Sequence, residues 1–228
     1  MGEMRYTFYM PTADQQVIGM LHKRGHKVTY ANDDAAKADI AIFTGGEDVH
    51  PIFYGEDILT TTMSNIRRDK REVKVFRSLP LEMPKVGICR GGQFLNIMSG
   101  GAMYQHIDGH LGAHEIFSDD WILGGPIKVS STHHQLMRPS PEAWIMWQAQ
   151  CTSKVHTDSE VIDTSHDADF IETEMCYYSH TNSLCCQPHP EYSGYPELTD
   201  AFFQVIDMLF EKDVDKRRGT QAKPVSVG

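Results

Sequence analysis

Residues 85–101, KVGICRGGQFLNIMSGG, join a mostly apolar segment to a helical segment through a turn that is rich in glycine. Lys85–Ile88 is short and apolar, which is typical of a buried strand, and Gly92–Met98 is typical of a helix. The turn between them, GICRG at 87–91, has the form glycine–x–nucleophile–x–glycine. The sequence therefore predicts a strand–turn–helix elbow with Cys89 at its tip.

The residue types at this elbow suit a thiol nucleophile. A sharp turn forces the residue at its tip into a strained backbone conformation, so its neighbours must lack a bulky Cβ. The N-terminus of the following helix favours negative charge and so favours a thiolate. A core cysteine that happens to have glycine neighbours is the alternative, because cysteine is among the most buried residue types. Cys89 is therefore a candidate nucleophile whose partners must be found elsewhere in the chain.

Strands and helices alternate before the elbow. The elements expected there are a strand at Tyr6–Tyr9, a helix at Asp14–Lys23, a strand at Lys27–Tyr30, a brief helical crossover at Asp33–Lys37, a buried strand at Asp39–Phe43 and a charged helix at Arg67–Leu79. This order predicts a parallel sheet with helices on both of its faces.

The chain after the elbow is rich in strands. They are expected at Ala113–Phe117, Pro126–Ser130, Ala143–Gln150, Phe170–Tyr177 and Ser183–Gln187. An amphipathic helix at Glu197–Glu211 is expected to pack back onto the sheet, and the polar segment beyond Lys212 is expected to be flexible. We thus predict an α/β fold with a mostly parallel central sheet and a β-rich second half. It would form one domain over residues 1–212, followed by a flexible tail over 213–228.

The composition excludes several classes of partner. The 228 residues contain 21 Lys+Arg and 31 Asp+Glu, for a net charge of −10, so the basic surface that binding to nucleic acid requires is missing. No run of 18 apolar residues predicts a membrane span. The five cysteines are an odd number with two adjacent, a poor framework for disulfides, and they indicate a reducing, cytoplasmic location. A small-molecule substrate is the partner that remains.

A base and an orienting group for Cys89 are found in QPHPE, residues 187–191. A nucleophile and its base meet in space rather than in sequence, so the separation from Cys89 is no objection. Pro190 restricts the backbone between His189 and Glu191, which lets the carboxylate hold the imidazole in one tautomer. A polar turn after a strand is the alternative for this motif by itself. Together the two motifs favour a Cys89–His189–Glu191 triad.

A glycine-rich segment, TGGEDVHPIFYGE at residues 44–56, follows the expected strand at Asp39–Phe43. Backbone N–H groups that are not screened by side chains can approach a developing oxyanion, which acyl transfer requires in addition to a nucleophile. An ordinary glycine turn is the alternative for Gly45-Gly46 alone.

These motifs, in this order, resemble those of the class I glutamine amidotransferase superfamily. Within it they resemble the γ-glutamyl-γ-aminobutyrate hydrolase-like branch of the γ-glutamyl hydrolases. The resemblance rests on GGEDVHPIFYGE (45–56), RRDKREVKVFRSLP (67–80), GICRGGQFLNIMSGGAMYQ (87–105), SSTHHQ (130–135) and QPHPE (187–191). It implies a flavodoxin-like three-layer α/β/α sandwich and a thioester mechanism that needs no cofactor.

The resemblance also implies roles for individual residues. The nucleophile would be Cys89, the base His189 and the orienting carboxylate Glu191. The oxyanion hole would be formed by the backbone N–H groups of Gly46, or Gly45, and of Arg90. The contacts to the glutamyl part of the substrate would be Gln93, His133, His134 and Gln135, for which a helix-surface amide and a strand-end turn are the alternatives.

Three functions are compatible with these residues. The first is a cysteine-dependent hydrolase that cleaves a γ-glutamyl amide, either glutamine or a γ-glutamyl amine or peptide, through a thioester on Cys89. The second is a glutaminase subunit that delivers ammonia to a separate synthase or ligase. The third is an inactive binding protein of the same fold, which the joint presence of Cys89, His189 and Glu191 disfavours because a strained elbow would then have no purpose.

Two other patterns suggest metal binding and are set aside. His106, His110 and His114 recur at every fourth residue, which would align three imidazoles on a helix, but Gly109 and Gly112 argue against a helix there. Cys185 and Cys186, adjacent on a strand, would point to opposite faces and so cannot chelate from one side. The sequence therefore predicts no metal site.

Overall fold

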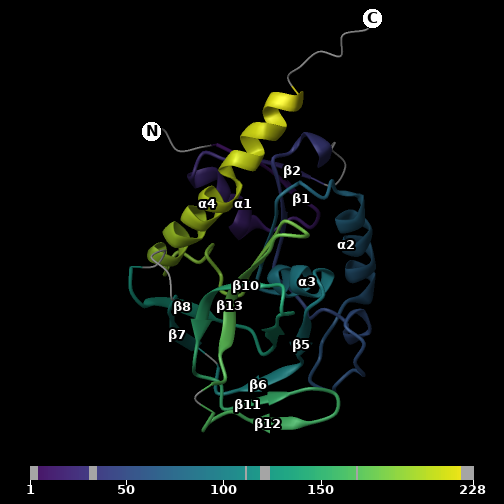
Figure 1. Ribbon diagram of the computed structural model, residues 1–228, viewed down its shortest axis with the longest axis vertical. Helices are drawn as coiled ribbons and strands as arrows, with labels where there is room; N and C mark the ends of the chain where they lie inside the picture. The colour runs from purple at the N-terminus through teal and green to yellow at the C-terminus, as the bar shows by residue number, and fades with distance from the viewer. Residues whose placement is uncertain (1–4, 31–34, 111, 119–123, 168, 222–228) are drawn as a thin grey trace, which may run out of the picture.

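The computed structural model describes residues 5–30, 35–110, 112–118, 124–167 and 169–221. Nine strands form a central sheet (Figure 1). They are β1 (Thr7–Met10), β2 (Lys27–Tyr30), β3 (Ile40–Phe43), β4 (Lys85–Ile88), β5 (Ala102–Tyr104), β9 (Leu136–Arg138), β10 (Trp144–Ala149), β13 (Glu172–Tyr178) and β14 (Ser183–Cys186). Their order is β2-β1-β3-β4-β14-β13-β9-β5, and β10 also pairs with β13.

The sheet has a parallel part and an antiparallel part. Strands β2, β1, β3, β4 and β14 pair in parallel, whereas β13 runs antiparallel to β14, β9 and β10. The register places Phe43 beside Gly87, and Ile88 beside Cys186. The loops that follow β3, β4 and β14 therefore leave the sheet at the same edge, which is where open α/β sheets bind ligands.

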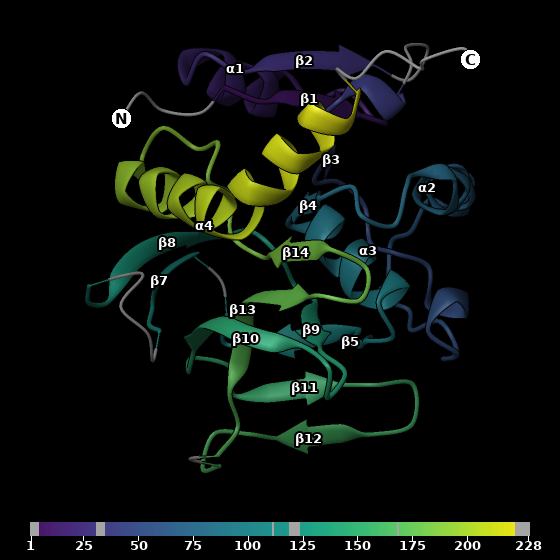
Figure 2. The same ribbon diagram turned by 45° about the horizontal axis from the view of Figure 1, so that its top comes forward.

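Helices cover both faces of the parallel part. Alternate residues of the strands face opposite sides, so Ile40 and Ile42 pack with α1 (Gln15–Lys23) and α4 (Pro196–Gln221). Ala41 and Phe43 pack on the other side with α2 (Ile66–Ser78) and α3 (Arg90–Met98). Figure 2 shows α4 and α2 on opposite sides of the sheet. No helix in the described ranges is both long and apolar enough to span a bilayer.

Local chemistry explains the first helix. Asp14 adopts an extended conformation as the N-cap of α1, and its carboxylate accepts hydrogen bonds from the backbone N–H groups of Gln16 and Val17. The buried side chains of α1 are Val17, Ile18, Met20 and Leu21. Gly25 follows with a φ of +78°, a conformation that glycine adopts without strain and that reverses the chain into β2.

The second half of the chain adds two small sheets. One consists of β6 (His106–Asp108), β11 (Lys154–His156) and β12 (Val161–Asp163), and the other is a hairpin of β7 (Gly112–Ile116) and β8 (Ile127–Ser131). Strands β5, β6, β9, β11 and β12 have three residues each, too few to show the alternation that predicts a strand from sequence. The short helices η1 (Ala35–Lys37) and η2 (Pro51–Phe53) complete the structure, and Asp33 of the expected crossover lies outside the described residues.

The prediction of a flexible tail over 213–228 is wrong for residues 213–221, which continue α4. Val214 is fully buried in the core beneath the helix. The guanidinium of Arg218 donates to both carboxylate oxygens of Asp39 at 2.8 and 2.6 Å, and Arg217 donates to the backbone carbonyl of Asp39 at 2.9 Å. This contact with the residue before β3 stabilises the last turns of the helix. Residues 222–228 lie outside the described part.

Candidate active site

Cys89 lies at the turn between β4 and α3, where it is the N-cap residue of the helix. Its φ of 51° and ψ of −114° are rare for a residue with a side chain, and such a conformation costs about 1–3 kcal/mol. The backbone N–H of Cys89 donates to the carbonyl of Cys186 at 2.7 Å, which ties the turn to β14. A Cβ atom on Gly91 would overlap the carbonyl of Phe43. Close backbone approach therefore explains why glycine occupies the turn.

His189 and Glu191 lie in the loop that follows β14. The imidazole Nδ1 of His189 is 2.7 Å from Oε1 of Glu191. The ring of Tyr192 stacks on the imidazole, with centroids 4.4 Å apart and planes 6° from parallel. An added Cβ on Gly45 would lie 3.3 Å from Cε1 of His189 and 3.9 Å from Cβ of Cys89, so both side chains meet beside this glycine. The structure brings together the three residues of the predicted triad.

The environment of His189 favours its charged form. Burial opposes the positive charge, but hydrogen bonds with Cys89 and Glu191, and the charges of these two groups, outweigh it and raise the pKa of His189 to about 11. A protonated imidazole between a sulfur and a carboxylate can hold its proton ready for transfer to a leaving group.

The predicted oxyanion segment lies beside Cys89 and is held by Arg68 of α2. The guanidinium of Arg68 donates to the carbonyls of Gly45 at 2.9 Å and Thr44 at 3.0 Å. Because a trans peptide directs its C=O and N–H to opposite sides, the N–H groups of Gly46 and Gly45 point away from Arg68. Gly46 has a φ of +139°, and a Cβ there would overlap the guanidinium. The conformation of this loop thus depends on glycine and on Arg68.

The side chain of Arg90 lies on the other side of the elbow. It forms buried ion pairs with Asp69 and Glu72 of α2, and Glu72 also accepts from Nε of Arg68 at 3.0 Å. Burial opposes ionisation of Glu72, but Arg90 and Arg68 outweigh it and lower the pKa of this carboxyl. The sequence analysis predicted a charged helix here but not that its charged face is buried. The Arg68–Glu72 spacing of four residues was the available signal.

A pocket of about 170 Å³ opens next to Cys89. Its lining consists of Gly46, Glu47, Asp48, Met63, Cys89, Arg90, Gln93, Thr132, His133, His134 and Gln135. The amide of Gln93 donates to the side-chain oxygen of Gln187 at 3.2 Å, and the amide nitrogen of Gln187 lies 3.9 Å from Sγ of Cys89. Gln187 is fully buried and was not predicted as a site residue, although it begins the QPHPE motif.

The segment after β8 supplies one wall of this pocket. Nε2 of His134 lies 3.1 Å from the carboxylate of Asp48, and this hydrogen bond raises the pKa of His134. The side-chain amide of Gln135 donates to the carbonyl of Gln105 at 3.2 Å. His133 is only 4% exposed, and its Nδ1 donates to the backbone carbonyl of Gln135 at 2.8 Å. Burial lowers the pKa of His133 to about 4, so its ring is neutral at pH 7.

The structure separates one of the three histidines that recur at every fourth residue from the other two. His106, on β6, contacts His134, with the two Nδ1 atoms 3.3 Å apart. His110 and His114, by contrast, lie close together, with His114 on the strand β7. The two adjacent cysteines behave as predicted, because Cys186 belongs to the core under α1 and α4 and Cys185 to the core on the opposite face.

Comparison with known proteins identifies the family. Residues 16–191 match the model of the family described as peptidase C26. The chain belongs to the peptidase C26 family. Relatives of this peptidase C26 chain are named as glutamine amidotransferase-like proteins.

Two relatives show how far the sequence similarity extends. A glutamine amidotransferase-like protein of Rickettsia prowazekii is 40% identical over 77 residues, which are 32% of this chain and 26% of that protein. A glutamine amidotransferase-like YvdE homologue of Lactococcus lactis subsp. cremoris is 33% identical over 105 residues, 41% of this chain and 55% of that protein. The peptidase C26 chain thus matches about a quarter to a half of the length of these relatives.

Solved structures extend the similarity to nearly the whole fold. A GMP synthase-like protein of Thermoplasma acidophilum superimposes with a TM-score of 0.65 at 15% identity, covering 97% of this chain and 100% of that chain. A glutamine amidotransferase of Thermotoga maritima gives a TM-score of 0.54 at 11% identity, with coverage of 93% and 86%. At these identities the likeness shows the fold alone. The predicted flavodoxin-like α/β/α architecture of this peptidase C26 protein is confirmed.

Proposed function

We propose that the protein hydrolyses a γ-glutamyl amide bond through a γ-glutamyl thioester on Cys89. The observation that supports this most is the position of Cys89 at a strained elbow beside His189, whose imidazole is 2.7 Å from Glu191. Nucleophile, base and orienting carboxylate in this arrangement are the requirements for covalent acyl transfer.

The proposed reaction has two stages. The Cys89 thiolate attacks the γ-carbonyl carbon, and His189 donates its proton to the departing nitrogen, which leaves as ammonia or an amine. Water then attacks the thioester while His189 accepts one of its protons, and the tetrahedral intermediate expels the Cys89 thiolate. Glutamate leaves as the γ-carboxylic acid, which releases its proton to the solvent. Glu191 keeps Nδ1 of His189 engaged, so that Nε2 is the nitrogen available for proton transfer.

Backbone N–H groups would stabilise the oxyanion of each tetrahedral intermediate. The proposed donors are Gly46, or Gly45, and Arg90, which flank Cys89 on the loops after β3 and β4. Preorganised donors of this kind supply a large share of the rate enhancement in acyl transfer. The hydrogen bonds of Arg68 on α2 to the loop after β3, and the buried ion pairs of Arg90 with α2, fix both loops before the substrate arrives.

The pocket suits the glutamyl part of a substrate. Its volume of about 170 Å³ is below the roughly 300–1,000 Å³ of sites for drug-sized ligands, so it accommodates a small acyl group while the amine part extends outward. Gln93, His134 and Gln135 remain the proposed contacts. The ring nitrogens of His133 face other protein groups rather than the substrate: Nδ1 faces the carbonyl of Gln135, and the ring groups with His110 and Glu174. We therefore assign His133 to the support of this wall.

A second candidate is a glutaminase subunit that releases ammonia from glutamine for a separate synthase or ligase. The likeness to the GMP synthase-like protein and to a chain of PurLQS from Thermotoga maritima supports it, the latter with a TM-score of 0.58 at 14% identity, covering 90% of this chain and 98% of that chain. In both candidates the same thioester forms on Cys89.

We also propose a cytoplasmic location and a single domain over residues 1–212. All five cysteines are free thiols, which supports a reducing, cytoplasmic environment. The central sheet combines strands from the start of the described residues (β1) with strands close to the final helix (β14), which supports one domain.

The two candidates are distinguished by product analysis. The purified protein is incubated with glutamine and, separately, with chromogenic γ-glutamyl anilides and γ-glutamyl amines, and the release of ammonia or amine is measured. Amine release by the isolated protein supports the free-standing hydrolase. Ammonia release from glutamine that rises only when a synthase or ligase is added supports the glutaminase role. No turnover of any substrate, with Cys89 unreactive to electrophiles, would leave the inactive binding protein.

A further inference from the structure

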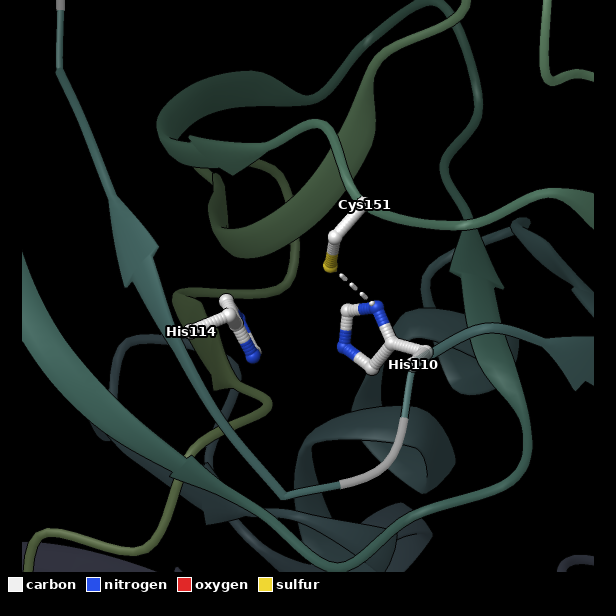
Figure 3. Close-up of side chains that lie close together, drawn as sticks. All are labelled: His110, His114 and Cys151. Carbon is white, nitrogen blue, oxygen red and sulfur yellow. Dashed lines mark hydrogen bonds between the residues drawn. The ribbon is translucent and has the colours of Figure 1, made fainter.

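A second group of polar side chains is buried in the antiparallel half of the molecule. His110 precedes β7 and is 2% exposed, His114 lies on β7, His133 follows β8 and is 4% exposed, and Glu174 on β13 is fully buried. Figure 3 shows the rings of His110 and His114 facing each other. Three parts of the chain, at β7, after β8 and on β13, thus contribute polar side chains to the same place.

The atoms of this group converge. Nε2 of His110 lies 3.3 Å from Oε1 of Glu174, and Nε2 of His114 lies 3.4 Å from the same oxygen. The ring of His110 is 4.4 Å from that of His114 and 4.6 Å from that of His133, between centroids. One ligand atom each from His110, His133 and Glu174 all lie within 4.8 Å of one another.

These converging atoms make no hydrogen bonds. Within the described part of the chain, Nε2 of His110, His114 and His133 and both carboxylate oxygens of Glu174 are buried without a hydrogen-bond partner. The 3.3 and 3.4 Å approaches to Glu174 lack hydrogen-bond geometry. Buried polar groups normally have partners, and a bare buried carboxylate is especially costly.

Hydrogen bonds at the far side of two rings determine which nitrogen carries a proton. Nδ1 of His133 faces the backbone carbonyl of Gln135 at 2.8 Å, and a carbonyl can only accept. Nδ1 of His110 faces the carboxylate of Glu172 at 2.6 Å. In a neutral ring each Nε2 then carries no proton and presents a lone pair. Lone pairs directed at a carboxylate repel it unless a cation lies between them.

We propose that His110, His114, His133 and Glu174 bind one divalent transition-metal ion, with Zn²⁺ as the best fit. Zn²⁺ binds histidine nitrogen at about 2.0–2.1 Å, so neighbouring ligands of a tetrahedral site are about 3.3–3.4 Å apart, which is the spacing of both nitrogens from Glu174. Imidazole nitrogens with one carboxylate suit zinc. Glu172 and the carbonyl of Gln135 orient two of the rings, as partners of metal-bound histidines do.

Another ligand set shares two of these residues. Sγ of Cys151 lies 2.9 Å from Nδ1 of His110, on the ring edge away from Nε2 (Figure 3), and His110, His114 and Cys151 also form a group within metal-binding distance. That set would leave Nε2 of His133 and the carboxylate of Glu174 without partners. The set with Glu174 gives a partner to the three unpartnered ring nitrogens and to the buried carboxylate, and is therefore preferred.

The competing occupant is a proton on His110. Burial opposes it, but hydrogen bonds to Cys151 and Glu172 and the nearby carboxylate of Glu174 raise the pKa of His110 to about 12. A protonated His110 would leave Nε2 of His114 and His133 unpartnered, which a metal ion would not.

A metal here would have a structural role next to the pocket. It would connect three elements: β7, the segment that follows β8, and β13. The proposed metal site does not depend on the proposed hydrolase activity. His133 precedes His134 and Gln135 in the pocket wall, and the carbonyl of Glu174 accepts from the backbone N–H of Gln187 at 2.8 Å. The site has four protein ligands and no open position for substrate, as structural zinc sites do.

The test is the metal content of the full chain. We expect the wild-type protein, loaded with Zn²⁺ and dialysed against metal-free buffer, to retain about one zinc per chain by plasma mass spectrometry. Glu174→Gln and His114→Gln should lose most of it, and Glu172→Gln should weaken affinity by about 10- to 100-fold. Cys151→Ser and His156→Gln, which alter a neighbouring thiol and a more exposed histidine outside the set, should retain it.

Chelation and reconstitution of the wild-type protein give the same information without substitutions. Adding Zn²⁺ to the chelated protein should raise its melting temperature in proportion to the logarithm of the metal concentration. Absence of retained zinc together with an unchanged melting temperature would overturn the proposal in favour of protonated His110. Loss of zinc in Cys151→Ser with retention in Glu174→Gln would overturn the ligand set, as would a thiolate-to-metal absorption band in the Co²⁺-loaded protein.

Discussion

Two buried polar groups in this molecule differ in how their atoms are paired. At the elbow, the imidazole of His189 forms hydrogen bonds with Glu191 on one side and with Cys89 on the other. Each polar group therefore has a partner, and Cys89 at the end of this series lines the pocket. Around Glu174, three ring nitrogens and a carboxylate converge without any hydrogen bond. On the two proposals, the first arrangement moves a proton to a substrate, whereas the second binds a cation. Pairing, more than residue type, distinguishes the two.

The two groups also lie in different parts of the fold. Cys89, Gly45 and His189 follow the carboxyl ends of parallel strands, where the register itself brings the loops together. His110 and His114 belong to the segment at β7, which reaches β13 through β10: Phe117 after β7 bridges to Gln148 of β10, and β10 pairs antiparallel with β13. The following predictions test whether the groups act as differently as their geometry indicates.

The largest effect is expected at the nucleophile. Cys89→Ala and Cys89→Ser should reduce kcat/KM by about 10³-fold or more, because the covalent step is lost. A diazo-ketone analogue of glutamine should label Cys89 alone in the wild-type protein, as read by peptide mass spectrometry. Cys151→Ser, which alters a thiol of the other group, is the matched control and should keep most of the activity. Labelling at Cys151 or Cys176 instead would contradict the assignment.

Loss of the orienting carboxylate should have the next largest effect. Glu191→Gln should lower kcat by about 10²–10⁴-fold, as expected for a misoriented general acid–base. Glu191 and Cys89 raise the pKa of His189 to about 11, so imidazolium is the form present below that value. Without the carboxylate this pKa falls, and the basic limb of the rate–pH profile, where the imidazolium loses its proton, should move to lower pH.

A kcat profile in Glu191→Gln with an unshifted basic limb would show that Glu191 does not act on His189.

The oxyanion loop should show an intermediate effect. Gly46→Ala should lower kcat by about 10- to 100-fold, because a Cβ would displace Arg68 and with it the carbonyls of Thr44 and Gly45. Gly100→Ala is the control, since Gly100 also has a positive φ, +93°, but has no atom within 4 Å of an added Cβ. Both variants should lose stability to thermal unfolding, and equal kcat values in the two would contradict the role of the loop.

The smallest effect on chemistry is expected from the group around Glu174. If its role is structural, His114→Gln should change the rate of Cys89 labelling by no more than about threefold, because His114 does not contact the elbow, while it lowers the melting temperature. The labelling rate and the melting temperature are measured on the same preparation, with His156→Gln as the control. A loss of labelling as large as in Glu191→Gln would show that the two groups do not act separately.

Much of the elbow could be predicted from the sequence because its chemistry is local. Glycines around Cys89 indicate a close backbone approach, and His189 and Glu191 are two residues apart, so each motif carries its own geometry. The common edge at which they meet follows from the predicted parallel strands.

The remaining features depend on long-range contacts. The charged residues of α2 resemble a solvent-exposed face, and their burial follows only from the packing of Arg90 and Gly45 against that helix. The extension of α4 depends on the contact of Arg218 with Asp39. The histidine spacing suggested a metal only on a helix, whereas the structure combines His110 and His114 with a carboxylate from β13. Glu172 and Glu174, at alternate positions of an apolar strand, were the signal that sequence reasoning did not use.

The most direct test of the account is detection of the acyl-enzyme. The protein is mixed with a γ-glutamyl substrate, quenched in acid within its first turnovers, digested and analysed by mass spectrometry. We predict a glutamyl adduct on the peptide that contains Cys89, which disappears on treatment with hydroxylamine and is absent from Cys89→Ser. Turnover without any adduct on Cys89, or an adduct on another residue, would contradict the account.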